Sequence, residues 1–171
     1  MTDWPPFTAR AKEWFESLRD SICAEFEAIE REAGSKATFD YIRWDRDTAD
    51  GSEGGGGVRG VMKGKVFEKV GVNWSEVHGT LGEKAQRAMA ARGVPGMDKD
   101  PRFWASGVSL VAHLQNPHAP AVHMNTRMFW TPGAWWFGGG FDLNPAAEDP
   151  ADTASFHAAL AAACDAHDPG Y

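Results

Sequence analysis

The hydrophobic positions at the start of the chain recur at three- and four-residue steps. They are Phe15, Leu18, Ile22, Phe26 and Ile29. This spacing places apolar side chains on one face of a helix. The pattern therefore predicts an amphipathic helix from about Thr8 to Glu32, which Gly34 would end.

Beyond this helix the pattern changes to the alternation and short apolar runs that are typical of strands. We expect strands at Thr38 to Arg46, Val58 to Met62, Val66 to Val70, Phe103 to His113, Ala121 to Trp130 and Ala134 to Leu143. Lys63-Gly64 lies between the second and third of these strands and is a hairpin signal.

Two more helices are expected. One runs from Leu81 to Ala91, and the last begins at Asp149-Pro150, where aspartate suits the cap and proline the first helical position. Phe156, Leu160 and Ala163 of this last helix would face inward. The order of helix, strands, helix, strands, helix predicts one α+β domain over residues 1–171, with a mainly antiparallel sheet flanked by helices.

The segment from Asp50 to Gly57 contains five glycines and predicts a mobile loop, either a simple connection or a lid that closes on a ligand. Gly55, Gly57 and Gly60 match GxGxxG, but no buried strand precedes them and no helix follows. The sequence therefore does not support nucleotide binding.

Composition narrows the function classes further. The net charge of −7 argues against a non-specific nucleic-acid binder, and 43% hydrophobic residues allow a real core. No stretch has the length and apolarity of a membrane span, and the start lacks the features of a signal peptide. We expect a soluble cytoplasmic protein, with no integral membrane contact, in which Cys23 and Cys164 are buried, reduced thiols.

The strand from Ala121 to Trp130 carries a polar row. Alternation places His123, Asn125 and Arg127 on one face, while Thr126 lies on the other with the apolar residues. A solvated face is the alternative, but this mix of residues is better suited to ligand binding, and the fork of Arg127 suits a carboxylate. If the preceding strand pairs with this one, Ser109 and His113 join the same face.

Three glycines interrupt the strand from Ala134 to Leu143. Gly138, Gly139 and Gly140 leave nothing to pack, so we expect a ligand or another backbone to approach closely there. Asp142 would share the face of Gly140 and could accept N–H donors from a flat ligand. The alternative is a bulge with Asp142 as a turn residue. His113, His118 and His123 also suggest a metal, although no zinc-type spacing is present.

Together these motifs resemble those of the oxygen-dependent coproporphyrinogen III oxidases of haem biosynthesis. The matching stretches are Gly54-Gly55-Gly56-Gly57, Val66 to Asn73, Val77-His78-Gly79, Ala105 to His113, Asn116-Pro117, Val122 to Arg127 and Trp135 to Leu143. The similarity begins at the first helix and covers about the N-terminal half of the family's length. The chain is therefore expected to be a truncated member, without a later histidine and a Gly-Gly-Arg motif.

The resemblance implies oxidative decarboxylation of two propionates of coproporphyrinogen III to vinyl groups, giving protoporphyrinogen IX. Oxygen is the co-substrate, no organic cofactor is needed, and a divalent metal is an open possibility. The resemblance also implies a homodimer built on a large antiparallel sheet with helices on both sides.

Residue roles follow from the same resemblance. Ser109 and Asn125-Thr126-Arg127 would contact substrate, together with Gly139 and Gly140. His123 is similar to the proposed proton donor and Asp142 to the partner of the pyrrole N–H groups. The histidines suggested as metal ligands are His113, His123 and His157.

Thr126 stands where the family usually has valine, and Phe141 and Asn144 also depart from its pattern. Two alternatives to the oxidase remain open at this point. One is a porphyrin- or haem-binding domain without turnover. The other is a scaffold fragment that folds only with its missing half and exposes sheet edges.

Overall fold

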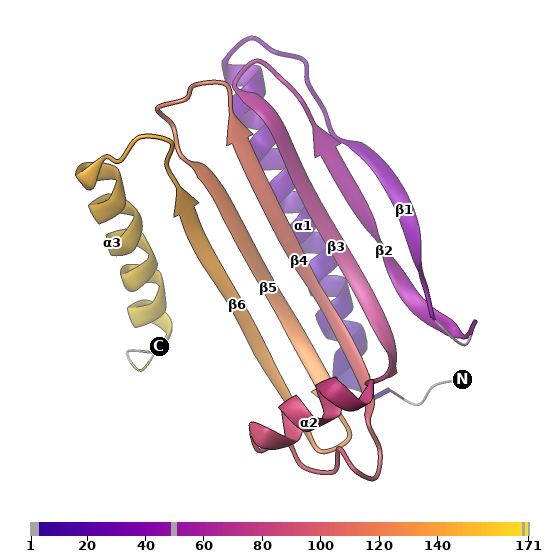
Figure 1. Ribbon diagram of the computed structural model, residues 1–171. Helices are drawn as coiled ribbons and strands as arrows, with labels where there is room; N and C mark the ends of the chain where they lie inside the picture. The colour runs from indigo at the N-terminus through magenta and orange to yellow at the C-terminus, as the bar shows by residue number, and fades with distance from the viewer. Residues whose placement is uncertain (1–3, 49–50, 169, 171) are drawn as a thin grey trace.

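The computed structural model describes residues 4–48, 51–168 and 170. Its centre is a six-stranded antiparallel sheet in which each strand pairs with the next along the chain (Figure 1). The strands are β1 (Asp40–Asp47), β2 (Glu53–Met62), β3 (Phe67–Thr80), β4 (Arg102–Leu114), β5 (Ala121–Thr131) and β6 (Ala134–Asn144). β1 and β6 are the two edges of the sheet.

Helix α1 (Pro6–Glu32) runs along one face of this sheet. The opposite face is turned toward the viewer in Figure 1. Helix α2 (Glu83–Ala91) covers the lower end of that face, and the rest of it stays open. The core forms between α1 and the sheet. From the helix it takes Ala11, Phe15 and Cys23, and from the strands it takes Met62, Val70, Val72, Trp74, Trp104, Val108, Leu110, Ala112, Met124, Met128 and Trp130. Burial of these side chains is the main force that holds the helix to the sheet.

A buried carboxylate fixes where α1 ends on the sheet. Glu30 is fully buried in the last turn of the helix, and it accepts the backbone N–H groups of Lys65, Val66 and Phe67 at 2.8, 2.9 and 2.9 Å. These residues follow the β2–β3 turn. A Cβ at Gly64 would lie 2.2 Å from the Glu30 carboxyl carbon, so only glycine fits there.

These donors also set the ionisation of Glu30. Burial alone would raise the pKa of this carboxyl. The N–H of Phe67, the Ser35 hydroxyl and the N–H groups of Lys65 and Val66 outweigh burial and hold its pKa at about 2.

The structure confirms the α+β class, the first helix and the hairpin at Lys63-Gly64. Within α1, Phe15 is buried and Leu18, Ile22 and Phe26 pack against the core, whereas Ile29 is exposed. β3 is much longer than the strand expected at Val66 to Val70, because residues 71–80 continue the pairing with β2 and β4.

The prediction of a mobile glycine loop was wrong. Gly54 to Gly57 lie inside β2, whereas Asp50 lies outside the described residues. The glycines let neighbouring groups come close: a Cβ at Gly57 would lie 2.2 Å from the Trp74 carbonyl oxygen and 2.8 Å from the Trp44 ring. Close approach, which the sequence pattern does not encode, explains this run.

The last helix is also different from its prediction. α3 (Pro150–His167) begins as expected, with the Asp149 carboxylate accepting the N–H of Ala151 at 2.8 Å. None of its residues, all of them described, is buried, because the helix stands beside the edge strand β6 instead of on the sheet (Figure 1). Phe156 and Leu160 are half-buried, and Ala163 is exposed.

The two cysteines have different environments. Cys23 is buried, and burial raises the pKa of its thiol, whereas Cys164 is exposed on α3. The expectation of two buried thiols therefore holds only for Cys23. In the described parts of the chain, no helix has the length and apolarity needed to cross a membrane.

We predict that Glu30→Gln lowers the free energy of unfolding at pH 7. A carboxyl pKa of about 2 in the folded protein, instead of the ordinary 4.5, corresponds to about 3 kcal/mol of stability. Because the folded-state pKa is lowered, this contribution is complete above pH 4.5 and disappears as the pH falls to about 2. Urea unfolding at several pH values measures both effects. Glu25→Gln, on the exposed side of α1, is the control, and equal losses in the two variants would contradict the assignment.

Candidate active site

The open face of the sheet gathers most of the residues that the sequence marked. Pairing places Ser109 opposite Asn125, and Val111 opposite His123. On the other side of β5, Gly140 pairs with Asn125 and Asp142 with His123. Residues that pair across neighbouring strands form a row across the sheet. Ser109, Asn125 and Gly140 form one row, and Val111, His123 and Asp142 form the next one on the same face. Ser109, Asn125, His123 and Asp142 therefore share one side of the sheet. The expectation that the predicted strands would pair and join these side chains is confirmed.

Arg127 lies one row further along this face. It pairs with Gly107 and with Gly138, and it is exposed. A Cβ at Gly107 would lie 2.7 Å from the Cβ of Arg127, so the glycine makes room for the arginine stem. A cavity of about 130 Å³ opens beside it and is lined by Asn73, Ser75, Val77, Ala105, Ser106, Gly107, Val108, Ser109, Asn125, Thr126 and Arg127.

Asn73, Ser75 and Gly107 were missed by the sequence reasoning. Asn73 and Ser75 lie in the part of β3 that the prediction left out. Alternation continued beyond Val70 would have placed both on this face, because Gly71, Asn73 and Ser75 follow one another at steps of two positions.

His123 and Asp142 form the most polar contact on the open face. The Nδ1 of His123 lies 2.7 Å from Oδ2 of Asp142, and the Asn144 side-chain amide donates to Oδ1. Both hydrogen bonds lower the pKa of Asp142, and the one from His123 has the larger effect. The carboxylate therefore stays ionised to lower pH than a free aspartate, and each of its oxygens can accept a further donor.

The glycine strand has two different faces. A Cβ at Gly138 or Gly140 would meet nothing within 4 Å, so the open face is bare there. A Cβ at Gly139 would lie 2.4 Å from the Asn125 carbonyl oxygen. Gly139 and Thr126 pair with each other, and both point to the face that carries α1. Close approach of a backbone therefore occurs at Gly139, whereas close approach of a ligand to the bare face stays a prediction.

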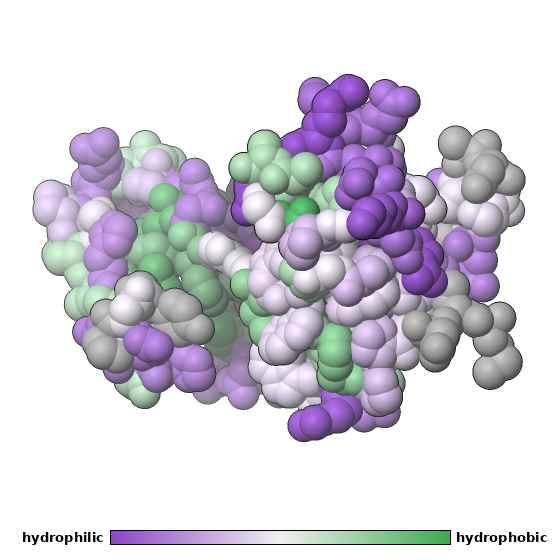
Figure 2. Space-filling model, turned by 90° about the horizontal axis from the view of Figure 1, so that it is seen from below, coloured by the Kyte–Doolittle hydropathy of each residue, from purple (hydrophilic) through white to green (hydrophobic). Residues whose placement is uncertain are grey.

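Aromatic rings lie beside this bare surface, where β5 and β6 lead into the turn that joins them. Phe129 stacks on Phe103 and on Trp136, with ring centroids 5.5 and 5.1 Å apart. Trp135 and Phe137 lie on the opposite face, and both are more than half exposed. Figure 2 shows hydrophobic surface in the hollow between α3 and the rest of the molecule, next to β6.

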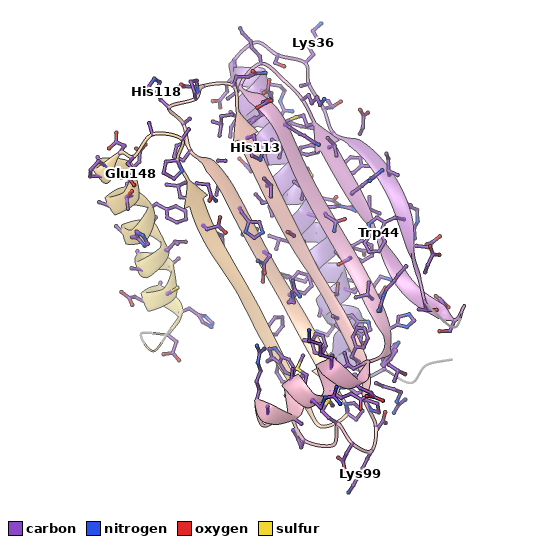
Figure 3. All side chains as sticks on the ribbon, in the orientation of Figure 1. Lys36, Trp44, Lys99, His113, His118 and Glu148 are labelled. Atoms are coloured by element: carbon purple, nitrogen blue, oxygen red, sulfur yellow. The ribbon has the colours of Figure 1, made fainter. Side chains whose placement is uncertain are left out.

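The histidines suggested as metal ligands are not all close together. His113 lies near the end of β4 and is a diagonal neighbour of His123 across the β4–β5 pair (Figure 3). His157 lies on α3, beyond the edge of the sheet. Within residues 4–48, 51–168 and 170, no three histidine, cysteine or acidic side chains gather where they could hold a metal ion. A metal role for these residues stays a prediction.

Comparison with known proteins now adds to this geometry. The family model described as Coproporphyrinogen III oxidase matches residues 10–171. The chain belongs to this family. The match includes every strand of the sheet and every candidate residue on its open face.

Similar proteins come from rickettsiae and carry the name oxygen-dependent coproporphyrinogen-III oxidase. The protein of Rickettsia bellii (strain RML369-C) is 50% identical over 158 residues, which are 92% of this chain and 54% of the relative. That of Rickettsia felis (strain ATCC VR-1525 / URRWXCal2) is 44% identical over 161 residues, or 94% of this chain and 56% of the relative. The chain thus spans about half the length of the curated relatives it matches.

We predict that His123→Ala raises the pKa of Asp142 toward the ordinary value of an aspartate, and that Asn144→Ala does so to a smaller extent. Each variant removes one of the two hydrogen bonds that stabilise the carboxylate. A pH titration of the carboxyl carbon signal by NMR measures the change. His118→Ala, in the β4–β5 loop, should leave the titration as it is in the wild type. An unchanged pKa in His123→Ala would contradict the contact.

We also predict that the same substitution has different effects on stability at two neighbouring glycines. Gly139→Ala should lower the free energy of unfolding by about 1–3 kcal/mol, because its Cβ would overlap a backbone oxygen of β5. Gly140→Ala should leave stability unchanged, since its Cβ would point into open space. Thermal unfolding of both variants tests the two faces of β6, and equal losses would show that the face assignment is wrong.

Proposed function

We propose that the chain provides the substrate-binding face of an oxygen-dependent coproporphyrinogen III oxidase. The reaction would convert coproporphyrinogen III to protoporphyrinogen IX in haem biosynthesis. The observation that carries this proposal is the bare surface at Gly138 and Gly140, which begins beside Arg127 and ends next to the Asp142–His123 pair. The names of the relatives support the same activity.

The surface suits a flat ligand with N–H groups at its centre and acidic arms at its edge. Bare glycines let a macrocycle approach the backbone. Asp142 is ionised, exposed and held in place by His123 and Asn144, so it can accept the pyrrole N–H groups of a porphyrinogen. Negative charge beside these groups makes the pyrrole more electron-rich and easier to oxidise.

Arg127 would bind a propionate through its two-pronged guanidinium, and Ser109 and Asn125 would add neutral hydrogen bonds. Holding one arm fixes which propionate faces the oxidant. Each reacting propionate would lose its carboxylate as carbon dioxide, together with one hydrogen from the carbon that joins the arm to the ring, and a vinyl group would remain. The two electrons released would pass to oxygen, which leaves as hydrogen peroxide. His123, hydrogen-bonded to Asp142, would supply the proton that this step requires.

The proposal includes oxygen as co-substrate and assigns no organic cofactor. A divalent metal would have His113 and His123 as its candidate ligands on the open face. A cytoplasmic homodimer is part of the same proposal. The homodimer is supported by an exposed apolar surface on one face of β6, formed by Trp135, Phe137 and Phe141. An apolar surface of this kind often marks an assembly site.

Product analysis tests the activity. The 171-residue chain is mixed with anaerobically reduced coproporphyrinogen III, air is admitted, and mass spectrometry follows the loss of one and two carbon dioxide units. We expect Asp142→Ala to reduce turnover by roughly 100-fold or more, and His123→Ala to reduce it less. A protein-free control accounts for spontaneous oxidation to coproporphyrin, which loses no carbon dioxide.

The same assay is repeated with a chain extended to the full length of the relatives. Decarboxylated product from either chain supports the proposal, and product from the longer chain alone means that turnover needs more than residues 1–171. Absence of product from both would contradict the activity and leave a porphyrin-binding role. Wild-type turnover in Asp142→Ala would refute the role of the carboxylate.

A further inference from the structure

A second arginine faces the same surface as Arg127. Arg59 of β2 is exposed and belongs to a row that crosses the sheet. Strand pairing builds this row from Ile42, Arg59, Asn73, Ser109, Asn125 and Gly140. Arg127 belongs to the next row, in which Gly57, Ser75 and Gly107 precede it. The two arginines therefore stand on opposite sides of the polar middle of the sheet.

Two cavities meet at this middle. One of about 230 Å³ is lined by Arg59, Gly71, Asn73, Ser109 and Val111, together with Gly60, Val61, Val72 and Leu110. The other, of about 130 Å³, contains Arg127. Asn73 and Ser109 line both cavities. A Cβ at Gly71 would meet nothing within 4 Å, so the surface beside Arg59 is bare in the same way as the surface at Gly140.

Asn73 is held so that it donates toward these cavities. Its Oδ1 accepts the indole N–H of Trp44 at 3.2 Å, and Trp44 lies over Gly57 on the open face (Figure 3). With its oxygen occupied, the amide presents its N–H groups to a ligand. Ser109 adds a hydroxyl. The row between the arginines therefore offers donors, which suit an anion.

In the described parts of the chain, neither the Arg59 nor the Arg127 guanidinium has a hydrogen bond, an ion pair or a ring contact. Arg59 and Arg127 are three strands and one row apart, which places their Cα atoms about 16 Å from each other. One small anion cannot reach both side chains, whereas a broad molecule with acidic groups on opposite sides can.

We propose that Arg59, with Asn73, forms a second carboxylate-binding subsite, which holds an acidic arm of the ligand opposite the arm bound by Arg127. This inference rests on the proposed function and adds to it a specific requirement. The ligand must carry carboxylates on two sides of a flat body, and both arginines must be present for full affinity.

Binding of coproporphyrin III, the stable oxidised form of the proposed substrate, tests this subsite. Fluorescence titration gives Kd for the wild type and for Arg59→Gln, Arg127→Gln and the double variant. We expect each single change to raise Kd about tenfold, as loss of one charged hydrogen-bonded contact does. The double variant should raise it about 100-fold, because distant sites act independently. The porphyrin's tetramethyl ester, which has no charged arms, should bind all variants equally.

Arg43→Gln is the matched control, since it removes the same charge from the neighbouring strand. Arg43 pairs with Val58, and the other partner of Val58 is Trp74, which is buried under α1. Arg43 therefore points away from the open face.

Wild-type affinity for coproporphyrin III in Arg59→Gln would overturn the second subsite. An equal loss of affinity for the tetramethyl ester in this variant would do the same. If Arg127→Gln alone weakens binding, the inference fails and the proposed function stands. If folded wild-type chain binds no coproporphyrin III, the titration is repeated with the chain extended to the full length of the relatives, and absence of binding there overturns both.

Discussion

The buried carboxylate of Glu30 is the contact on which the arrangement of the sheet and helix depends. It joins the last turn of α1 to three consecutive N–H groups after the β2–β3 turn. These groups would otherwise lose their hydrogen bonds to water when α1 covers them. One side chain therefore satisfies the turn and positions the helix at the same time. Because α1 is tied to that end of the sheet, its apolar side chains lie over the middle strands.

Covering only one face gives the sheet two different surfaces. Trp74, Trp104 and Met128 lie under α1, where they build the core. The alternate positions of the same strands carry Asn73, Arg127 and bare glycines, which no helix covers in the described residues. Strand alternation thus separates packing from chemistry within each strand. A change on one face can be made with little effect on the other, except where a glycine permits close approach.

The electrostatics of the open face follow from this division. Net charge is −7, yet the middle of this face holds Arg59 and Arg127, with Asp142 at one corner. An anionic ligand is therefore attracted by local guanidinium groups rather than by the overall field. Asp142 stays ionised through its hydrogen bonds to His123 and Asn144. The surface can then hold acidic arms at its arginines and N–H groups at its carboxylate.

Much of this was determined by the sequence itself. Periodicity identified α1, α2 and most of the sheet, and alternation placed His123, Asn125 and Arg127 on one face, because a strand allows no other arrangement of neighbours. The resemblance in the glycine strand and in the His123 strand led to the family that the comparison confirms. These features are local, so a few neighbouring residues are enough to encode them.

The remaining features were decided by the tertiary structure. Gly54 to Gly57 resemble a loop in sequence but form a strand, because Trp44 and β3 approach them closely. Phe156 and Leu160 predict an inward face, yet α3 lies beyond β6, where the described residues give it no sheet to cover. Arg59 joins the surface of Arg127 only through the register of four strands. Such contacts join residues far apart in the chain, and no local pattern records which of them will meet.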